Sequence, residues 1–194
     1  MLADVRAFPR SRSNPAFNID TFPALLQEHD IAYRHFEKLG GRRQRQDGVE
    51  PALNGYWRIQ SFHNYADYAL SREFKSAIAN IERFAENYRV ALMCSEAVWW
   101  RCHRRIIADH LMAHGHEVIH LMTPKRRDEA EMTEAAIIRQ SDEVVYPSSG
   151  YRSELIEPIP LCRYERLAIR ENELRALRAD QASRSSSSPD ETTS

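Results

Sequence analysis

The sequence predicts an α/β protein: a single compact domain with a mainly parallel sheet flanked by helices, followed by a C-terminal helix and a disordered tail. Three observations lead to this prediction. Short apolar runs alternate with stretches of helical periodicity. The apolar content of 42% over 194 residues is enough to bury one sizeable core. A serine-rich segment at the end has no apolar surface to bury.

Five apolar runs are predicted as strands. They are residues 2–6, 31–36, 89–94, 117–121 and 143–146. Helical stretches separate most of them, and strands that alternate with helices usually run parallel in one sheet. The polar connections at 40–48 and 51–62 are predicted as loops or lids.

Three helices are predicted between the strands. The first begins at Asp20, which is placed to cap it, and runs to residue 29. The second follows Ser71, where apolar residues recur at the i, i+3, i+4, i+7 spacing of one buried stripe. These residues are Phe74, Ala77, Ile78, Ile81, Phe84, Ala85 and Tyr88. The third covers about 102–114 and ends at Gly115.

The chain is predicted to have four parts. Residues 1–146 form the α/β core domain, and 147–160, rich in Pro, Ser and Gly, form a linker loop. Residues 161–182 are charged and carry leucines at helical spacing, which predicts an amphipathic helix. Residues 183–194 are predicted to be a disordered Ser-rich tail.

Composition excludes several classes of protein. Lys and Arg number 27 against 28 Asp and Glu, so the chain lacks the basic surplus of a general polyanion binder. No apolar stretch approaches the roughly 18 residues of a membrane span, and we expect no membrane partner. Three cysteines do not make a disulfide scaffold, so we expect a reducing, cytoplasmic location. The sequence identifies neither a cofactor nor an oligomeric state.

Residues 90–121 indicate where a ligand would bind. They are predicted to form a buried strand, a loop, a helix, a glycine stop and a strand. Ligands of open α/β sheets bind beyond the carboxyl ends of the strands, and Cys94 stands at such an end. The next helix directs its N-terminus to the same edge, which favours an anion or a thiolate there.

A helical wheel of that helix sorts its charged residues. Arg104 begins the buried stripe, so its guanidinium should point toward the sheet edge and be paired with Asp4 or Glu96. Arg105 and Asp109 fall on a more outward face and should make an i, i+4 surface pair. The wheel therefore predicts Arg104 at the ligand site and the other two residues away from it.

The candidate catalytic residues are Cys94, Glu96 and His103. Cys94 is the candidate nucleophile, with His103 as the base that would take its proton. Glu96 is the candidate general acid or base. The alternatives are a buried cysteine that closes a strand and a carboxylate that only pairs with Arg104. Cys102 points away from Arg104 unless its turn is irregular.

Cys94, Cys102 and His103 also suit zinc or iron, although their spacing is unusual and a fourth ligand is missing.

Two basic loops add possible ligand contacts. The loop over 4–17 offers Arg6 and Asn14, whose donors suit phosphate or carboxylate. A second loop carries Arg42, Arg43 and Arg45. Aromatic residues between positions 56 and 68 suit stacking on a nucleotide base but are explained at least as well as core residues.

Four motifs in this order, DVRAFPRSRSNPAF, LGGRR, YADY and MCSEAVWWRCHRR, resemble the Domain of Unknown Function 488 family. The resemblance implies a small bacterial or archaeal α/β protein without an established activity. Its polar centre would contain Asp4, Arg6, Asn14, Cys94, Glu96, Cys102, His103 and Arg104. Relatives usually carry a strand and a helix before the DVR motif, so the resemblance implies a core without that unit or a shortened sequence.

Three functional hypotheses follow. The one we favour is an enzyme with a polar pocket for a small anionic or nucleotide-like ligand, held by Asp4, Arg6, Asn14 and Arg104. The second is a nucleic-acid-binding or regulatory module that uses the basic loops and the aromatic residues. The third is a metal-binding protein that uses Cys94, Cys102 and His103.

Overall fold

The computed structural model describes residues 1–139 and 143–151. The predicted helix at 161–182, the predicted tail at 183–194 and most of the predicted linker at 147–160 lie outside the described residues. Within the described ranges, no helix combines the length and the apolar character needed to cross a membrane.

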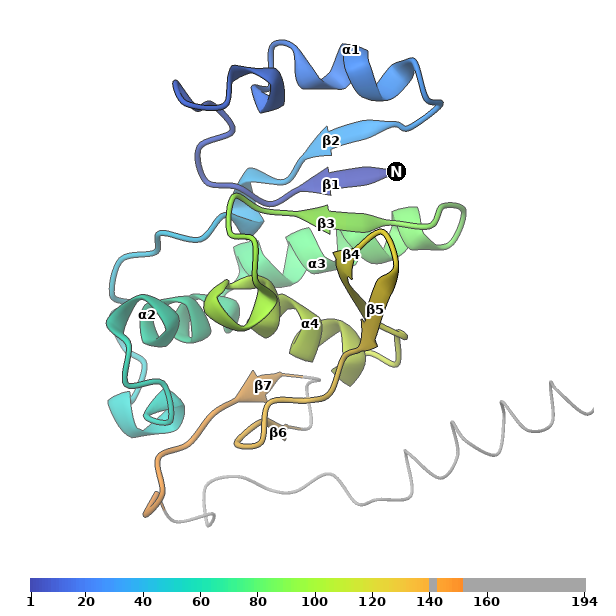
Figure 1. Cartoon of the computed structure of the whole chain (residues 1–194). Coiled ribbons are helices and arrows are strands. Elements are labelled where there is room, and N and C mark those ends of the chain that lie inside the picture. Colours follow the sequence, from blue (N-terminus) through green and yellow to red (C-terminus); the bar gives the residue numbers. More distant parts are fainter. Residues whose placement is uncertain (140–142, 152–194) are drawn as a thin grey trace, which may run out of the picture. The chain divides into compact units, whose positions relative to one another are not determined.

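The described elements alternate between short strands and helices (Figure 1). They are β1 (Leu2–Asp4), α1 (Phe22–Gln27), β2 (Tyr33–His35), α2 (Gln60–Ala69), α3 (Arg72–Ala85), β3 (Ala91–Met93), α4 (Arg104–Ala113), β4 (Ile119–Thr123), β5 (Arg126–Glu129), β6 (Ile137–Ile138) and β7 (Val144–Val145). Short 3-10 helices at Pro15–Phe17, Glu37–Leu39, Pro51–Asn54 and Trp99–Arg101 lie in the connections.

A parallel sheet in the order β2-β1-β3 is the centre of the fold. Leu2 is in register with Tyr33 on one side and with Ala91 on the other. One hydrophobic core joins β1 to the helices; its buried members include Ala3, Val5, Tyr65, Phe74, Ile78, Ile106 and Ile107. Figure 1 shows α1 on the far side of β2 from α2, α3 and α4. The prediction of a single α/β domain with a parallel sheet is therefore confirmed.

The strands predicted at 117–121 and 143–146 form as β4 and β7, but neither belongs to the parallel sheet. β4 pairs with β5 and β6 pairs with β7, both antiparallel. After β4 the hydroxyl of Thr123 accepts hydrogen bonds from the backbone N–H groups of Lys125 and Arg126, so the chain turns back at once. Such a short connection can join only antiparallel strands. The partner strand β5 is polar and exposed, so no apolar alternation in the sequence predicted it.

The second and third predicted helices form close to their predicted bounds. Ser71 caps α3, because its hydroxyl accepts the N–H of Phe74 at 3.2 Å. Phe74, Ala77, Ile78 and Ile81 of α3 are buried, as the stripe predicts. The end of the predicted stripe is wrong, because Ala85 and Tyr88 are exposed and Tyr88 lies beyond the helix. α4 starts at Arg104, two positions after the predicted start, and Gly115 follows its end with a positive φ of 90°.

The predicted cap of the first helix is wrong. Thr21 holds the N-cap position of α1 and makes no side-chain capping bond. The Asp20 carboxylate instead accepts two hydrogen bonds from the Arg10 guanidinium, both at 2.8 Å. A carboxylate with a bidentate arginine partner is no longer available to the helix terminus.

The 3-10 helix Pro51–Asn54 and the first turn of α2 lie where the sequence predicted a loop at 51–62. Tyr65 and Tyr68 are buried, and their hydroxyls donate to the carbonyl oxygens of Leu39 and Lys38 at 2.8 and 2.7 Å. Trp57 is also buried, and it stacks on Phe62 with ring centres 5.0 Å apart. These rings pack in the core, which leaves little of their surface for stacking on a nucleotide base.

The predicted surface pair between Arg105 and Asp109 is also wrong. Asp109 is buried, and its carboxylate accepts the backbone N–H of Thr133 at 2.9 Å and the hydroxyl of Tyr146 at 2.8 Å. Arg105 donates to the Thr133 hydroxyl at 3.0 Å, and its guanidinium lies 5.2 Å from the Trp57 ring centre. The chain after β5 thus covers the face of α4 that the helical wheel left to solvent.

Candidate functional site

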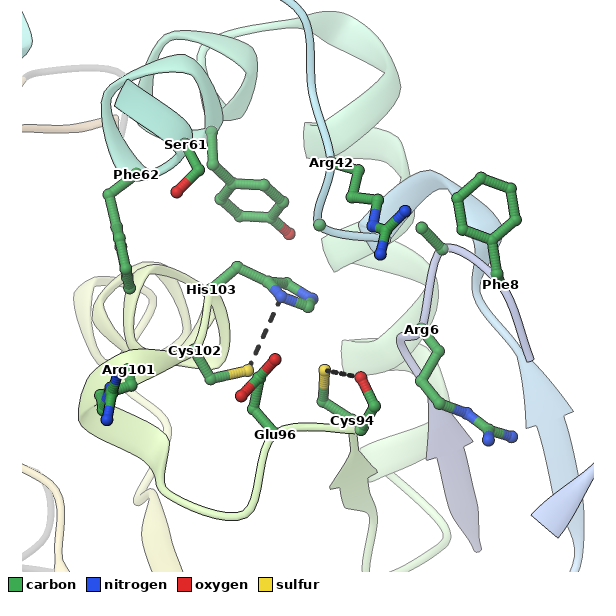
Figure 2. A pocket seen from close by; sticks show the side chains of 14 residues that line it. Arg6, Phe8, Arg42, Ser61, Phe62, Cys94, Glu96, Arg101, Cys102 and His103 are labelled. Carbon is green, nitrogen blue, oxygen red and sulfur yellow. Dashed lines mark hydrogen bonds between the residues drawn. The ribbon is translucent and has the colours of Figure 1, made fainter. Parts of the chain in front are cut away.

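A cavity of about 240 Å³ opens where the strands of the parallel sheet end (Figure 2). Its lining residues follow β1, β2 and β3 or come from α2 and the turn before α4. They are Arg6, Ala7, Phe8, Gly41, Arg42, Ser61, Phe62, Tyr65, Cys94, Ser95, Glu96, Arg101, Cys102 and His103. This is the edge at which ligands of open α/β sheets bind.

Two thiols and an imidazole meet in the wall of this cavity. The sulfur atoms of Cys94 and Cys102 and a ring nitrogen of His103 all lie within 4.8 Å of one another. Cys94 is half-buried and Cys102 is buried. Cys102 faces the cavity because it follows the 3-10 helix Trp99–Arg101 in an extended conformation, before α4 begins. This is the irregular turn that the sequence analysis required.

The His103 ring is fixed by contacts on three sides. Its Nε2 donates to the carbonyl oxygen of Val5 at 3.1 Å, so Nδ1 is the nitrogen without the proton and lies 3.6 Å from the Cys102 sulfur. The Tyr65 ring centre is 4.9 Å away. Gly41 packs against the ring: a Cβ on this residue would lie 2.9 Å from Nδ1.

Arg104 lies beside the sulfur of Cys102. Its backbone N–H and its Nε both donate to that sulfur, at 3.5 and 3.4 Å, and its Nη2 donates to the carbonyl oxygen of Glu96 at 2.5 Å. The predicted ion pair with Asp4 or with the Glu96 carboxylate is therefore wrong. Arg104 does not line the cavity; it supplies two N–H donors to the sulfur of Cys102.

The two thiols shift each other's pKa in opposite directions. The Cys102 thiol, as hydrogen-bond donor to Cys94, lowers the pKa of Cys94 well below its ordinary value, and burial of Cys94 opposes this effect. The same contact raises the pKa of Cys102. Ionisation of Cys94 is thus favoured over ionisation of Cys102.

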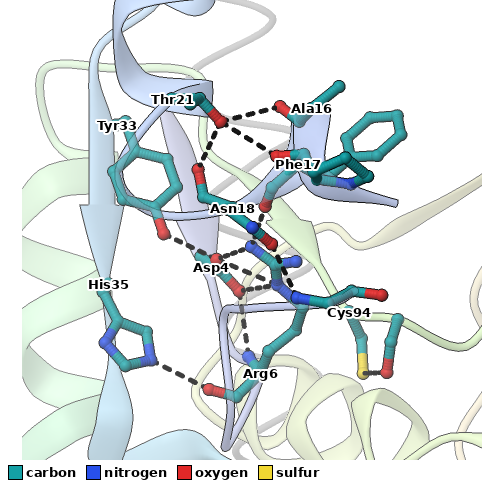
Figure 3. A network of polar contacts seen from close by, with 12 residues as sticks. Asp4, Arg6, Ala16, Phe17, Asn18, Thr21, Tyr33, His35 and Cys94 are labelled. Carbon is teal, nitrogen blue, oxygen red and sulfur yellow. Dashed lines mark hydrogen bonds and ion pairs between the residues drawn. The ribbon is translucent and has the colours of Figure 1, made fainter. Parts of the chain in front are cut away.

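Asp4 and Arg6 form a buried ion pair next to the cavity (Figure 3). Arg6 Nε donates to both carboxylate oxygens at 2.9 and 3.0 Å, and Tyr33 donates to one of them at 2.6 Å. Burial opposes ionisation of Asp4, but these donors keep its pKa below the ordinary value. Arg6 also donates to the carbonyl oxygen of Phe17, which ties the loop after β1 to the sheet.

The rim of the cavity carries two further arginines, Arg42 and Arg101. Both are exposed, and neither makes an ion pair within the part of the chain that the structure describes. The Arg42 guanidinium lies 5.4 Å from the ring centre of Phe8, which holds it over the opening. The Glu96 carboxylate also faces the cavity (Figure 2).

The structure brings together only part of the predicted site. Cys94, Glu96, His103 and Arg6 line the cavity, and Cys102 joins them. Asp4 contacts the cavity only through Arg6, whose guanidinium points away from the cysteines in Figure 2. Asn14 is exposed outside the cavity lining, and its backbone N–H donates to Ser11.

Several lining residues were not singled out from the sequence. They are Ala7, Phe8, Ser61, Ser95 and Arg101. The signal for Arg42 was the glycine pair before it, since Gly40 and Gly41 let this loop approach Ala7 and His103 closely. No local pattern in the sequence marks the five residues that were not singled out.

Comparison with known proteins gives one match. The family model described as "Domain of unknown function DUF488" matches residues 1–111, which include every residue that lines the cavity. No curated protein matches the chain. No solved structure matches it either.

Proposed function

The chain belongs to the DUF488 family, a domain of unknown function, and we propose that it is an enzyme that acts on a small anionic substrate in this cavity. One observation carries the proposal: the cluster of Cys94, Cys102 and His103 lies in the wall of a cavity with Arg42 and Arg101 at its rim. A reactive cluster and anion-binding donors in one cavity are the expected parts of such an active site.

The rim arginines support an anionic substrate. A guanidinium presents a planar fork of N–H donors that matches phosphate or carboxylate oxygens. Arg6 is neutralised by Asp4, so Arg42 and Arg101 are the cavity cations that would meet the substrate. The volume of about 240 Å³ is below the usual range of ligand pockets, which favours a small molecule or the anionic head of a larger one.

The groups in the cavity suit displacement at an electrophilic centre of an anionic ester: the nucleophile forms a bond to that centre while the bond from the centre to the leaving oxygen breaks. The nucleophile arises at the cysteine–histidine cluster, where Nδ1 of His103 lies 3.6 Å from the Cys102 sulfur. Glu96 faces the same cavity and would move a proton at the leaving group. The predicted nucleic-acid module has less support, because most of the rings it needs are in the core.

The anion-binding part of the proposal is tested with two alkylating agents of similar size. Iodoacetate is anionic and iodoacetamide is neutral, and the rate at which each modifies Cys94 in the chelator-treated full chain is measured by peptide mass spectrometry. We expect the iodoacetate-to-iodoacetamide rate ratio to fall in Arg42→Gln and in Arg101→Gln. The control is Arg45→Gln, an exposed arginine of the same loop outside the cavity lining. An unchanged ratio in both rim variants would overturn the proposal.

The catalytic part is tested with a panel of chromogenic esters: 4-nitrophenyl phosphate, 4-nitrophenyl sulfate and the neutral 4-nitrophenyl acetate. We expect turnover of at least one anionic ester, loss of that turnover in His103→Gln, and no such loss in the exposed control His29→Gln. Absence of turnover of both anionic esters, or turnover that survives His103→Gln, counts against an enzyme of this class.

A further inference from the structure

We infer that Cys94, Cys102 and His103 bind one transition-metal ion of the zinc type, with a coordination position open to the cavity. The inference rests on the proposed function, because it names the cofactor of the same site. It is carried by the donor atoms, their separations and the hydrogen bonds around them.

The set of donor atoms is that of a catalytic zinc site. Such sites have three protein ligands and one position for water or substrate, and two thiolates with one imidazole is a known combination. Sulfur and imidazole nitrogen are ligands that zinc accepts, whereas magnesium and calcium prefer oxygen. Among residues 1–139 and 143–151 the cluster has three protein ligands, which is the number that an open catalytic site requires.

The separations fit tetrahedral coordination. Zinc bonds of roughly 2.3 Å to sulfur and 2.05 Å to nitrogen place these two ligand atoms roughly 3.6 Å apart in a tetrahedron. The Cys102 sulfur and His103 Nδ1 are 3.6 Å apart. Two sulfur ligands would be roughly 3.8 Å apart. The Cys94 sulfur lies within 4.8 Å of both other atoms and needs at most a small side-chain rotation to complete the set.

The surrounding hydrogen bonds orient the ligand atoms. Metal-binding histidines usually donate their second ring nitrogen to a carbonyl or carboxylate oxygen. His103 does so to Val5, which leaves the Nδ1 lone pair on the side of the two sulfurs. The Cys102 sulfur receives N–H groups from Arg104, which favour a thiolate. Cysteines that only fill space in the core would need neither the His103–Val5 hydrogen bond nor the hydrogen bonds from Arg104 to Cys102.

The open position faces the cavity, since all three ligand residues line it. A water molecule or an anionic oxygen of the substrate would occupy that position, within the space that Arg42 and Arg101 border. When bound, zinc supplies a Lewis acid and lowers the pKa of its water. Glu96 is the lining carboxylate placed to exchange a proton with that water.

The test uses the full chain purified without chelator, and its readout is independent of activity. We expect about one zinc ion per chain by elemental analysis. We also expect Co²⁺ to replace zinc and give sulfur-to-cobalt charge-transfer absorption together with the intense visible bands of tetrahedral cobalt. Cys94→Ser, Cys102→Ser and His103→Gln should each lose zinc and weaken these bands. Cys162→Ser and His29→Gln are the thiol and imidazole controls and should keep both.

Far-UV circular dichroism of the metal-free variants shows whether each is folded, and Cys94→Ser is the most informative because this residue is half-buried. Absence of zinc and of cobalt–thiolate absorption in the parent protein would overturn the inference, as would metal binding that survives in folded Cys94→Ser. The alkylation ratios in the rim variants can still support the anion site in that case. Conversely, bound zinc with unchanged alkylation ratios refutes the anion site and leaves the metal site standing.

Discussion

His103 donates a hydrogen bond from Nε2 to the backbone carbonyl of Val5, 98 positions earlier in the sequence, at 3.1 Å. Val5 follows the central strand β1 and is completely buried. The sheet therefore fixes both the orientation and the tautomer of the imidazole. This one contact leaves Nδ1 directed at Cys102.

Gly41→Ala should displace this imidazole. The added Cβ would lie 2.9 Å from His103 Nδ1, so the ring must move. We expect a loss of unfolding free energy of about 1–3 kcal/mol in urea denaturation and weaker Co²⁺ binding. In a His103→Ala background the space is free, and the same substitution should have little effect on stability. Equal losses in both backgrounds would show that the contact with His103 is not the cause.

Asp4→Asn should strongly destabilise the fold. The substitution leaves Arg6 buried without its carboxylate partner, and breaking a buried ion pair in this way costs about 3–5 kcal/mol. Urea denaturation measures the loss. The exposed pair of Arg10 and Asp20 is the control, and Asp20→Asn should change stability little. Similar effects of the two substitutions would contradict the structural role given to Asp4.

The pH dependence of stability should distinguish Asp4 from Asp109. Arg6 and Tyr33 keep the pKa of Asp4 low despite burial, so its contribution is present above the ordinary aspartate pKa, about 3.9, and is lost as pH falls through the folded value. Burial raises the pKa of Asp109, although Thr133 and Tyr146 oppose it. Its contribution is therefore present at low pH and is lost as pH rises through the folded value.

Urea denaturation over a pH series checks these signs. The stability difference between the parent and Asp4→Asn should shrink as the pH falls. The difference between the parent and Asp109→Asn should shrink as the pH rises. If the two stability differences changed with pH in the same direction, the environments assigned to Asp4 and Asp109 would be contradicted.

Ser71→Ala should remove the N-terminal cap of α3. The Ser71 hydroxyl accepts the N–H of Phe74 at 3.2 Å, and loss of such a cap costs about 1 kcal/mol. Thermal unfolding measures this loss, with Ser13→Ala, an exposed serine in a loop, as the control. A Ser71 variant as stable as the control would show that the cap contributes nothing.

The sequence predicted the features that depend on short-range patterns. The stripe after Ser71 identified α3, and the apolar run that ends at Cys94 placed this cysteine at the edge of the sheet. The same spacing is present in α2, where Phe62, Tyr65, Ala66 and Ala69 stand at i, i+3, i+4 and i+7. The sequence analysis interpreted these aromatic residues as core or as a stacking surface and assigned no helix to them.

Features that depend on distant segments could not be predicted in this way. A helical wheel shows which residues of α4 share a face, but not that the chain near Thr133 and Tyr146 covers Asp109. The position of Cys102 depended on whether the helix starts at 102 or at 104, a difference of two residues that sequence patterns do not resolve. Arg104 binds a backbone carbonyl, which no residue pattern reveals.

The central claim is that the cavity holds an anion beside the cysteine–histidine cluster, and protection of Cys94 by inorganic phosphate tests it most directly. The measurement is the rate of Cys94 alkylation by neutral iodoacetamide in the chelator-treated full chain as phosphate is added. We predict that phosphate slows the reaction to a saturating limit, and that Arg42→Gln and Arg101→Gln require more phosphate for the same effect. An alkylation rate that does not change with phosphate would contradict the claim.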